Sequence, residues 1–321
     1  MYMVAGITKI LKIFLRRPYW FFRYQLPVML KKMKKDLRYT RHRFTYTQKS
    51  RERAVMRLFM ECHGYTFDFK NPQTLNEKIA VRKLSQDPRL PILADKYAVR
   101  DYVRQAVGEE YLVPLYFHGI KFTKEDFQKL PRQCVIKTAN ASSTNILIFD
   151  KEKESPGKII NQVKRMQKIR YGFYIMEMFY NAIPPRVIVE EMLLDESGNI
   201  PRDYKFHCFP HADNGKGKLF IQVDFGRFGK HTRNLYDENW NLLPFRHAKH
   251  PTDSEGVAPP EKLKEMLEIV KKLAQEWEYV RVDLYYTRGK IYFGEMTFTP
   301  SAATGKFDPP EYDKIWGDEW K

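Results

Sequence analysis

The sequence predicts a globular α+β protein, and two kinds of pattern carry this prediction. Residues 53–108 and 261–277 show the 3.6-residue period of amphipathic helices. Elsewhere lie short alternating or continuous apolar runs bounded by turn residues, which are typical of strands. With 321 residues, of which 43% are hydrophobic, the chain is long enough for two or three lobes around a sizeable core.

The first 53 residues form a basic arm. They hold 15 Lys/Arg and 2 Asp/Glu, which leaves 41 and 37 for residues 54–321, so the net charge of +17 belongs mostly to the arm. Basic residues interrupt its apolar runs, which argues against a membrane-spanning helix or a cleaved signal peptide. Aromatic residues at 20–24 and lysines at 31–35 favour contact of residues 1–43 with an anionic membrane surface. A basic helix packed on the body and a nucleic-acid-binding patch are the alternatives.

The cysteines indicate the compartment. Three widely spaced cysteines without a zinc pattern favour a reducing setting. We therefore expect a cytoplasmic protein that is peripheral on the inner face of the plasma membrane, with no nucleic acid among its partners.

The stretch after the arm contains two predicted helices. Thr74 and Glu77 form a capping box, which places the start of the first helix at residue 75 and its end near residue 84. The second helix is expected from about residue 91 to residue 107 and carries Lys96 among charges that suit a solvated face. We expect a helical region over residues 54–130.

A lysine at the end of a strand marks a candidate phosphate site. The apolar run 133–137 ends on Lys137, the small polar residues 138–145 follow, and a second strand is expected at 146–149. Such a loop can offer backbone N–H groups to phosphates while the lysine neutralises charge. A polar hairpin is the alternative interpretation.

Two carboxylates end a further buried strand. Residues 186–192 form an apolar run up to Glu190 and Glu191, which suits a hinge against an adenine edge or, alternatively, an edge charge pair. A linker is expected at 151–158, followed by a helix to about residue 170. Strands are expected at 203–209 and 218–224, then a polar and basic cluster at 229–234 and a loop at 246–260. An amphipathic helix is expected at 261–277.

Residues 279–300 predict a β-hairpin. Apolar and polar residues alternate on both sides of residues 288–289, which suit the turn. Because successive side chains point to opposite faces, a two-residue turn would place Asp283 opposite Gly294 and send Glu295 to the other face. A three-residue connection, with a positive φ at its glycine, would reverse this arrangement.

In the second register, Arg281, Asp283, Glu295 and Thr297 share one face, and both carboxylates lie within reach of one cation. Mg²⁺ takes one or two protein carboxylates and fills its other positions with phosphate oxygens and water, so this face suits Mg²⁺-nucleotide chemistry. The alternative is an ordinary hairpin whose outer face carries charges.

The order of these features resembles the ATP-grasp fold, in which two α+β lobes hold ATP between them. Four segments are similar to the TupA-like ATP-grasp family, which takes its name from teichuronopeptide biosynthesis and belongs to bacterial surface-polysaccharide assembly: residues 71–79, 93–100, 231–237 and 293–300. The resemblance covers about residues 54–315. The arm, residues 1–53, lies outside it. The chain is thus expected to continue with a helical region at 54–130, a small nucleotide-binding lobe at 131–192 and a large lobe with the metal site at 193–321.

The resemblance also implies a role for each matching residue, with ATP and Mg²⁺ as cofactors. Lys96, Lys137, Ser142 and Ser143 would contact ATP, and Glu190, Glu191 and Met192 would form the adenine hinge. The catalytic contacts would be Lys205 and Arg233, on the γ-phosphate or an acyl phosphate, and Arg281, as a phosphate clamp. Asp283 and Glu295 would hold Mg²⁺ with Thr297. Two departures from the family pattern concern the site: Thr297 replaces the usual asparagine, and the loop 138–145 lacks glycine.

The activity that the resemblance implies is ATP-dependent ligation of a carboxylate to an amine. In such a reaction a carboxylate attacks the γ-phosphate to give an acyl phosphate, which an amine then converts to an amide. A carboxylate-bearing, uronic-acid glycan and an amine or amino acid are the expected substrates. A kinase on the same fold, a glycosyltransferase that prefers a sugar nucleotide, and a basic adaptor with a degenerate nucleotide site are the alternatives.

Overall fold

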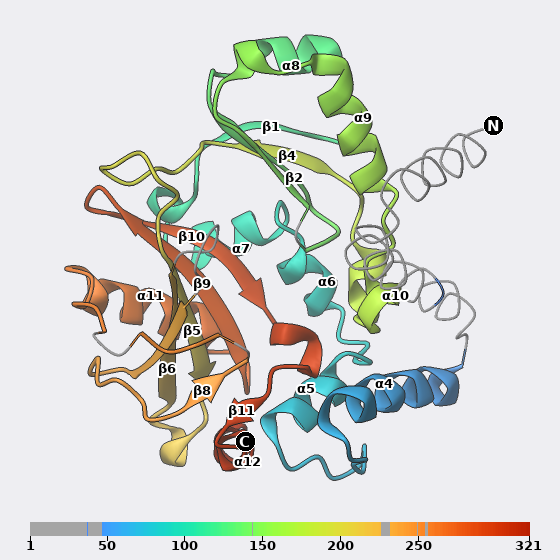
Figure 1. Cartoon of the computed structure of the whole chain (residues 1–321), viewed down its shortest axis with the longest axis vertical. Coiled ribbons are helices and arrows are strands. Elements are labelled where there is room, and N and C mark those ends of the chain that lie inside the picture. Colours follow the sequence, from blue (N-terminus) through green and yellow to red (C-terminus); the bar gives the residue numbers. More distant parts are fainter. Residues whose placement is uncertain (1–36, 38–46, 143, 226–231, 249, 254–255) are drawn as a thin grey trace, which may run out of the picture. The chain divides into compact units, whose positions relative to one another are not determined.

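The computed structural model describes residue 37 and residues 47–142, 144–225, 232–248, 250–253 and 256–321 (Figure 1). The chain divides into two compact units, residues 1–51 and 52–321, and both sheets described below belong to the second. The membrane contact predicted for residues 1–43, apart from Leu37, and the nucleotide contact predicted for Ser143 lie outside the described residues.

The smaller sheet has four antiparallel strands in the order β1-β4-β2-β3. Its strands are β1 (Leu115–Gly119), β2 (Cys134–Thr138), β3 (Asn145–Ile148) and β4 (Val187–Glu190). The helices α8 (Lys124–Lys129) and α9 (Pro156–Gln167) lie along this sheet (Figure 1) and share one apolar core with it. The strands predicted at 133–137, 146–149 and 186–192 are confirmed.

Two expectations for this region are wrong. Residues 54–130 are not helical throughout, because β1 lies within them; its alternation of half-buried and exposed residues at a sheet edge gives only a weak strand signal. Residues 151–158 are not a linker throughout, because a 3₁₀ turn (Lys151–Lys153) and the first turn of α9 occupy part of them. Proline suits that first helical position, since its missing N–H has no partner there in any case.

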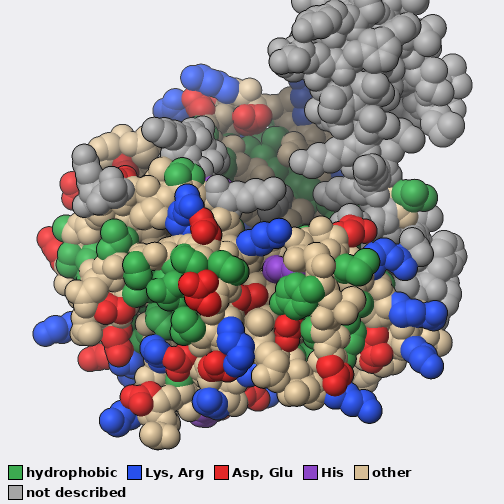
Figure 2. Space-filling view, turned by 60° about the horizontal axis from the view of Figure 1, so that its bottom comes forward, with side chains coloured by type: hydrophobic (Ala, Val, Ile, Leu, Met, Phe, Trp, Pro, Cys, Tyr) green, Lys and Arg blue, Asp and Glu red, His purple; other side chains and the backbone are tan. Residues whose placement is uncertain are grey.

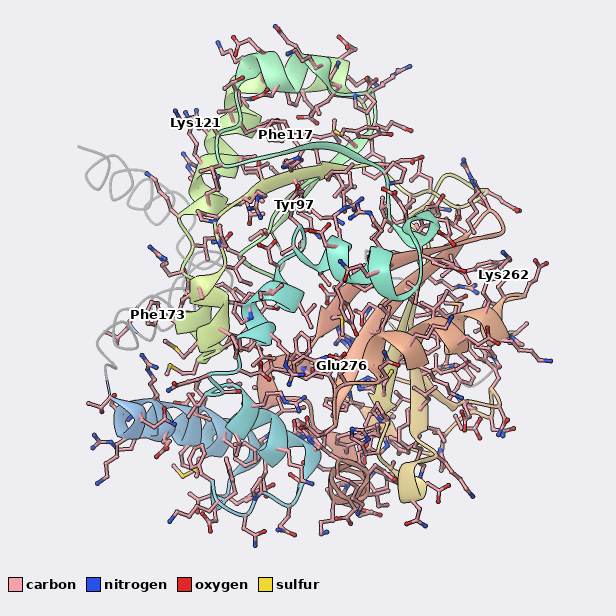
Figure 3. All side chains as sticks on the ribbon, turned by 180° about the vertical axis from the view of Figure 1, so that it is seen from behind. Tyr97, Phe117, Lys121, Phe173, Lys262 and Glu276 are labelled. Atoms are coloured by element: carbon pink, nitrogen blue, oxygen red, sulfur yellow. The ribbon has the colours of Figure 1, made fainter. Side chains whose placement is uncertain are left out.

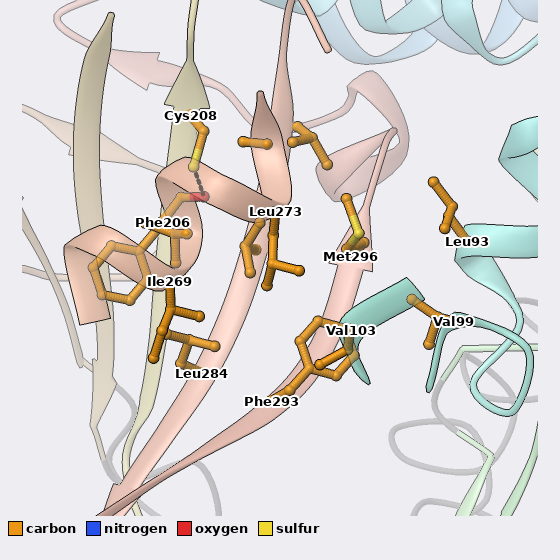
Figure 4. Close-up of a cluster of buried hydrophobic side chains, with 14 of the residues drawn as sticks. Leu93, Val99, Val103, Phe206, Cys208, Ile269, Leu273, Leu284, Phe293 and Met296 are labelled. Atoms are coloured by element: carbon orange, nitrogen blue, oxygen red, sulfur yellow. Dashed lines mark hydrogen bonds between the residues drawn. The ribbon is translucent and has the colours of Figure 1, made fainter. Parts of the chain in front are cut away.

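The larger sheet has five antiparallel strands in the order β10-β9-β5-β6-β7. Its strands are β5 (Asp203–Phe209), β6 (Lys218–Phe225), β7 (Thr232–Asp237), β9 (Val280–Thr287) and β10 (Lys290–Thr297). The amphipathic helix α11 (Leu263–Ala274) lies against β5 and β9, where apolar side chains such as Phe206, Ile269 and Leu284 pack together (Figure 4). The strands predicted at 203–209 and 218–224, the hairpin and this helix are confirmed.

The segments between β6 and α11 are more regular than expected. Within the polar and basic cluster predicted at 229–234, the residues from Thr232 onward belong to β7. Within the loop predicted at 246–260, β8 (Arg246–His247) pairs with β11 (Phe307–Asp308). Both strands are hard to recognise locally, because β7 begins with polar residues and β8 pairs with a distant segment.

Successive side chains of β5 point to opposite faces of the sheet, and this decides which of them face away from α11. The even-numbered residues 204–208 pack in the core that includes α11, so the odd-numbered residues 203–209 point to the opposite face. All residues of β5 are buried, including Asp203, Lys205 and His207. A central strand of this sheet therefore carries buried charges on one face and apolar side chains on the other.

A β-bulge at Gly294 sets the register of the hairpin. Arg288 and Gly289 have φ values of 50° and 70° and form a two-residue turn. From that turn, a regular register would place Asp283 opposite Gly294. The register shifts after Phe293, however, and Asp283 pairs with Glu295. The two carboxylates thus share one face because of a bulge, and the three-residue connection is wrong.

The second predicted helix is interrupted at Asp95. Two shorter helices, α6 (Arg89–Ala94) and α7 (Val99–Ala106), replace it, because Asp95 has an extended backbone and its carboxylate accepts a hydrogen bond from the Tyr97 N–H at 2.8 Å. The Tyr97 ring, labelled in Figure 3, stacks on a histidine of β1 with 4.4 Å between ring centroids. The interruption leaves Lys96 outside both helices, in the connection beside the smaller sheet.

The predicted capping box opens α5 (Leu75–Arg82) and is confirmed. This helix packs on the C-terminal helix α12 (Glu311–Glu319), and both join α4 (Gln48–His63) in a second apolar core. Gly317 permits the close approach of α12, because a Cβ there would lie 2.3 Å from the Gln73 carbonyl oxygen. No side chain fits in that space without moving backbone.

Replacing Gly317 with alanine is expected to lower the free energy of unfolding by about 1–3 kcal/mol, the usual cost of overpacking. In an open helix, alanine instead stabilises by about 0.5–1 kcal/mol relative to glycine. Gly157 of α9 supplies the matched control, since a Cβ there meets nothing within 4 Å. Denaturant unfolding of both variants checks the prediction, and equal stability of the two would contradict the close packing of α12.

Candidate active site

Charged side chains gather on the face of the larger sheet that points away from α11. They come from all five strands: Asp203 and Lys205 on β5, Asp224 on β6, Arg233 on β7, Arg281 and Asp283 on β9, and Glu295 on β10. Residues that pair directly across antiparallel strands lie close together. The register pairs Lys205 with Asp283, Asp224 with Arg233, and Asp283 with Glu295.

Lys205 lies among three aspartates. Its Nζ is 2.7 Å from Asp203 Oδ2, 3.5 Å from Asp224 Oδ2 and 3.6 Å from Asp283 Oδ2. The four side chains are 1–7% exposed, so the ammonium group has little water around it. A buried charge needs opposite charges and hydrogen bonds around it, and here the lysine and the aspartates supply these to each other.

Arg281 bridges the two carboxylates that were predicted to hold a metal. Its Nε lies 2.7 Å from Asp283 Oδ1, and one terminal nitrogen lies 2.8 Å from Asp283 Oδ2 and 3.1 Å from Glu295 Oε1. The same nitrogen donates to Thr297 Oγ1 at 3.1 Å, and this hydroxyl donates to Glu295 Oε1 at 2.9 Å. One positively charged group thus contacts both carboxylates and the threonine.

Arg233 is held at the side of this cluster. Its Nε lies 2.7 Å from Asp224 Oδ1, and another guanidinium nitrogen donates to the His247 carbonyl oxygen at 3.3 Å. Burial alone would raise the pKa of Asp224, but Arg233 and Lys205 hold this pKa well below its ordinary value. The carboxylate of Asp224 is therefore ionised across the physiological range.

The smaller sheet presents a second ion-pair cluster. Lys137 Nζ donates to Glu190 Oε2 at 2.6 Å, and Arg100 donates to Glu190 Oε1 at 3.3 Å. Lys96 Nζ donates to the Ala141 carbonyl oxygen at 2.6 Å, which ties it to the loop after β2. Burial lowers the pKa of Lys96, while the negative charge of Glu295 on the larger sheet opposes this shift.

One polar cleft is lined by both clusters. Its lining residues come from the helix connection, the smaller sheet and the larger sheet: Lys96, Arg100, Lys137, Ser142, Asn145, Glu190, Asp203, Asp283, Tyr285, Phe293, Gly294 and Glu295. The structure therefore brings together residues that are widely separated in the sequence. The two lysines lie on the side of the smaller sheet together with Glu190, and Asp203, Asp283 and Glu295 lie on the side of the larger sheet.

Some of the predicted site residues lie behind the cleft surface. Among the described residues, the lining of the cleft does not include four predicted residues of the larger sheet that contact acidic side chains: Lys205, Arg233, Arg281 and Thr297. Nor does it include Glu191 and Met192 of the predicted hinge. The Glu191 N–H donates to the Pro114 carbonyl oxygen at 2.9 Å.

Several lining residues were not predicted. Arg100 follows Lys96 at a spacing of four in the sequence, which could have suggested a shared helical face. Tyr285 and Phe293 belong to the hairpin strands, and the alternating pattern of the hairpin does not distinguish them from its other residues. Asn145 lies where the small polar loop enters β3, and no spacing rule links it to a nucleotide.

The donor set fits Mg²⁺ only in part. Across the described ranges, no group of three or more His, Cys, Asp or Glu side chains is arranged to hold a metal ion. Asp283 and Glu295 supply two carboxylates bridged by one cationic nitrogen, and Mg²⁺ bound with a nucleotide needs only one or two protein carboxylates. The residues thus fit a Mg²⁺ whose remaining ligands are phosphate oxygens and water.

Two buried histidines lie beneath this face. His207 Nδ1 lies 2.8 Å from the Tyr279 hydroxyl, and its ring centroid is 6.2 Å from that of His247. His247 Nδ1 is buried without a hydrogen-bond partner in the described structure. Burial, reinforced by Arg233 and Arg281, lowers the pKa of His247 to about 3, and burial lowers the pKa of His207 well below its ordinary value.

We expect these histidines to make the fold acid-sensitive. Between the unfolded pKa of about 6.5 and the folded pKa, the unfolded chain binds more protons, so the free energy of unfolding falls as the pH falls, by up to about 1.4 kcal/mol per pH unit for each histidine. Urea unfolding from pH 7 to pH 4 should show this slope, and His247→Leu should make it shallower. An unchanged slope in the variant would contradict the lowered pKa.

Comparisons with solved structures find many ligases at low identity. D-alanine–D-alanine ligase from Bacillus anthracis complexed with ATP is 14% identical over 68% of this chain and 56% of that chain, with a TM-score of 0.37. D-alanyl-alanine synthetase A from Vibrio cholerae is 14% identical over 70% and 59%, with a TM-score of 0.41. Phosphoribosylamine–glycine ligase from Thermotoga maritima is 12% identical over 70% and 55%, with a TM-score of 0.39.

The matches thus span less than two thirds of each of these three structures. A comparison with curated proteins finds no match.

The fold and its cleft define an ATP-grasp protein. A family model described as TupA-like ATPgrasp matches residues 77–321, and the chain belongs to this family. The match includes both sheets and all of the cleft residues, and the basic arm lies outside it.

Proposed function

We propose that this protein is an ATP-dependent carboxylate–amine ligase that acts through an acyl phosphate in bacterial surface-polysaccharide biosynthesis. The observation that carries the proposal is the cleft: Lys96 and Lys137 line one side, and Asp283 and Glu295 line the other. Lysines suit the phosphates of a nucleotide, and paired carboxylates suit the metal that accompanies it. Membership of the ATP-grasp family supports the same assignment.

The proposed nucleotide contacts are already oriented by other residues. Glu190 holds Lys137 at 2.6 Å, and the Ala141 carbonyl holds Lys96 at 2.6 Å. Ser142, next to Ala141, lines the same cleft and would add a hydroxyl donor for the phosphates. We propose that Glu190, Glu191 and Met192 receive the adenine, as the family resemblance implies.

The phosphoryl group would be transferred at the carboxylate side of the cleft. Arg281 contacts both Asp283 and Glu295. These contacts support its proposed role as a clamp for a phosphate that binds beside the two carboxylates. Lys205 and Arg233 pair with Asp283 and Asp224 and thereby set the charge of that wall. We propose that these three cations stabilise the γ-phosphate and then the acyl phosphate.

The metal would be held by the paired carboxylates. When bound, Mg²⁺ supplies positive charge that neutralises the transferred phosphoryl group. Asp283 and Glu295 would hold it, and the Thr297 hydroxyl, 2.9 Å from Glu295 Oε1, replaces the amide that related proteins place there.

The proposed substrates are a uronic-acid glycan and an amine or amino acid. The family's place in surface-polysaccharide assembly supports a glycan, and a basic arm supports a site of action at the cytoplasmic face of the membrane. Within the described residues, no helix is both long and apolar enough to cross a bilayer. The face drawn in Figure 2 carries basic and acidic side chains interspersed, which agrees with a body of small net charge.

A thermal-shift panel tests whether the cleft binds ATP. A ligand that binds only the folded state raises the apparent stability, so ATP with Mg²⁺ should raise the melting temperature more than any sugar nucleotide. Lys137→Met should lose this shift, whereas Lys124→Met, an exposed change on α8, should retain it. A larger shift with a sugar nucleotide would favour a glycosyltransferase and contradict the proposal.

Deleting residues 1–43 is expected to release the protein from anionic liposomes while nucleotide binding persists. The arm carries most of the net charge, and each basic residue near an anionic surface contributes about 1 kcal/mol of attraction. Liposome sedimentation at two salt concentrations checks this, with neutral liposomes as the control. Equal sedimentation of the full-length and shortened proteins would remove the membrane contact.

A further inference from the structure

An arginine outside the cleft, Arg186, contacts the connection that carries Lys96. This connection joins α6 to α7, and in it Lys96 lies between Asp95 and Tyr97 and lines the cleft. Arg186 directly precedes β4 and, among the described residues, is not part of the cleft lining. Its side chain has no part in the nucleotide and metal contacts proposed above.

The Arg186 side chain contacts both sequence neighbours of Lys96. One guanidinium nitrogen lies 3.3 Å from Asp95 Oδ2, in an ion pair whose aspartate side chain is only 4% exposed. The guanidinium carbon lies 4.5 Å from the centroid of the Tyr97 ring. A planar guanidinium group can pair with a carboxylate and stack on an aromatic ring at the same time. One side chain therefore holds the residues on either side of Lys96.

Asp95 and Tyr97 are also held by other groups. Asp95 Oδ1 accepts hydrogen bonds from the Tyr97 N–H at 2.8 Å and the Ala98 N–H at 3.3 Å. The Tyr97 ring, labelled in Figure 3, stacks on His118 of β1 with 4.4 Å between the ring centroids. These contacts fix the backbone on both sides of Lys96.

The backbone of Arg186 contacts the loop that Lys96 reaches. The Arg186 carbonyl oxygen accepts a hydrogen bond from the Ala139 N–H at 2.8 Å, and Lys96 Nζ donates to the Ala141 carbonyl oxygen of the same loop at 2.6 Å. Ser142, the next residue, lines the cleft. The contacts form a closed ring, which runs from Arg186 through the loop to Lys96 and returns through the aspartate ion pair.

A flexible lysine binds a phosphate weakly, because binding must restrict its side chain and the backbone that carries it. Holding the ammonium group in place before the ligand arrives removes part of this cost. We propose that Arg186 is a positioning residue, which holds Lys96 through Asp95 and Tyr97 where its ammonium group meets the phosphates of ATP. This inference rests on the nucleotide binding proposed above. Arg186 acts through Lys96 and does not touch the nucleotide.

A double-mutant cycle on ATP affinity tests the proposal. Arg186→Met removes the charge and the planar group but leaves the backbone hydrogen bond to Ala139 intact. The dissociation constant of ATP, measured with Mg²⁺ by isothermal titration calorimetry, should rise about 10-fold, a change typical of the coupling between residues in contact. The same change in a Lys96→Met protein should have no further effect on ATP affinity, because the lysine through which Arg186 acts is then absent.

Two control variants separate positioning from a general loss of charge or of stability. Arg132→Met removes an arginine that pairs with Asp150 at 2.9 Å while its side chain stays 74% exposed, and it should leave ATP affinity unchanged. Ile159→Val shortens a buried side chain in the core that α9 shares with the smaller sheet. It should lower the resistance to denaturant without changing ATP affinity. A loss of ATP affinity in either control as large as in Arg186→Met would overturn the positioning role.

The outcomes separate this inference from the function beneath it. Independent effects of the Arg186 and Lys96 changes on ATP affinity, or no effect of Arg186→Met alone, would overturn the role of Arg186 while ATP binding stands. Absence of ATP binding by the wild type would instead overturn the proposed function, and the inference with it.

If Arg186→Met does not fold, Arg186→Lys repeats the cycle. Lysine retains the positive charge but lacks the planar group that pairs and stacks, so ATP affinity should fall when Lys96 is present and stay unchanged when it is absent. An equal fall in the Lys96→Met protein would contradict the proposal.

Discussion

Replacing Glu295 with glutamine is expected to reduce ATP-dependent turnover by at least about 10²-fold, the usual effect of removing one group that stabilises charge in a transition state. Glu295 is one of the two carboxylates that Arg281 bridges, and its oxygen lies 3.1 Å from the guanidinium nitrogen. Its side chain is 45% exposed, so the change should cost little stability. Phosphate release measured against Mg²⁺ concentration should show both a lower maximum rate and weaker dependence on Mg²⁺.

Glu278→Gln provides the control for this change. Glu278, whose side chain is 51% exposed, forms an ion pair with Arg82 at 2.8 Å, next to the start of the same hairpin but away from the cleft. Its loss should leave turnover unchanged. Asp283→Asn should reduce turnover at least as strongly as Glu295→Gln. It should in addition destabilise the fold, because Lys205 and Arg281 would lose a buried partner. Full activity of both cleft variants would contradict a metal site at Asp283 and Glu295, and the hairpin would then be an ordinary one whose outer face carries charges.

Replacing Lys205 with methionine is expected to produce the largest loss of stability. Methionine has a similar length, so the change removes the positive charge and leaves Asp203, Asp224 and Asp283 facing one another in a site that is 1–7% exposed. Removing one member of a buried ionic group typically costs about 3–5 kcal/mol. Denaturant unfolding at pH 7 measures the loss, and acidification should reduce the difference, because protonated aspartates no longer repel.

Lys262→Met provides the control for Lys205. Lys262, labelled in Figure 3, forms an ion pair with Glu265 at 3.2 Å while its side chain stays 43% exposed. Exposed pairs of this kind contribute about 0–1 kcal/mol. Similar losses in the two lysine variants would show that burial does not govern the energy of the Lys205 cluster.

The elements that sequence patterns predict well are those whose signal is local. The Thr74 and Glu77 capping box starts α5 where predicted. A continuous apolar run marks the buried strand β4, and alternating polar and apolar residues mark β5. The edge strand β1 lacks such a local signal, because three of its five residues are only partly buried and the other two are exposed. The break at Asp95 also escapes prediction, because its cause is a carboxylate that turns back to its own backbone and pairs with the distant Arg186.

The site residues likewise divide into those that a local sequence pattern predicts and those that depend on tertiary contacts. The hairpin pattern marked Asp283 and Glu295 as a pair, but their register depends on a bulge at Gly294 that alternation alone does not reveal. The ion pair between Arg100 and Glu190 joins residues on separate elements, and the pairing of Lys205 with Asp224 depends on sheet order. Tertiary contacts of this kind are set by packing, and they decide which charges line the cleft and which lie behind it.

The path of a heavy oxygen isotope tests the central claim most directly. The protein is incubated with ATP, Mg²⁺, an oligoglucuronate labelled in its carboxyl oxygens and a mixture of amino acids, and phosphate and glycan are examined by mass spectrometry. If the carboxylate attacks the γ-phosphate, one labelled oxygen leaves with phosphate when the amine displaces it. We expect labelled phosphate together with an amide. Unlabelled phosphate alongside an amide, or a phosphorylated glycan without an amide, would contradict the acyl-phosphate ligase.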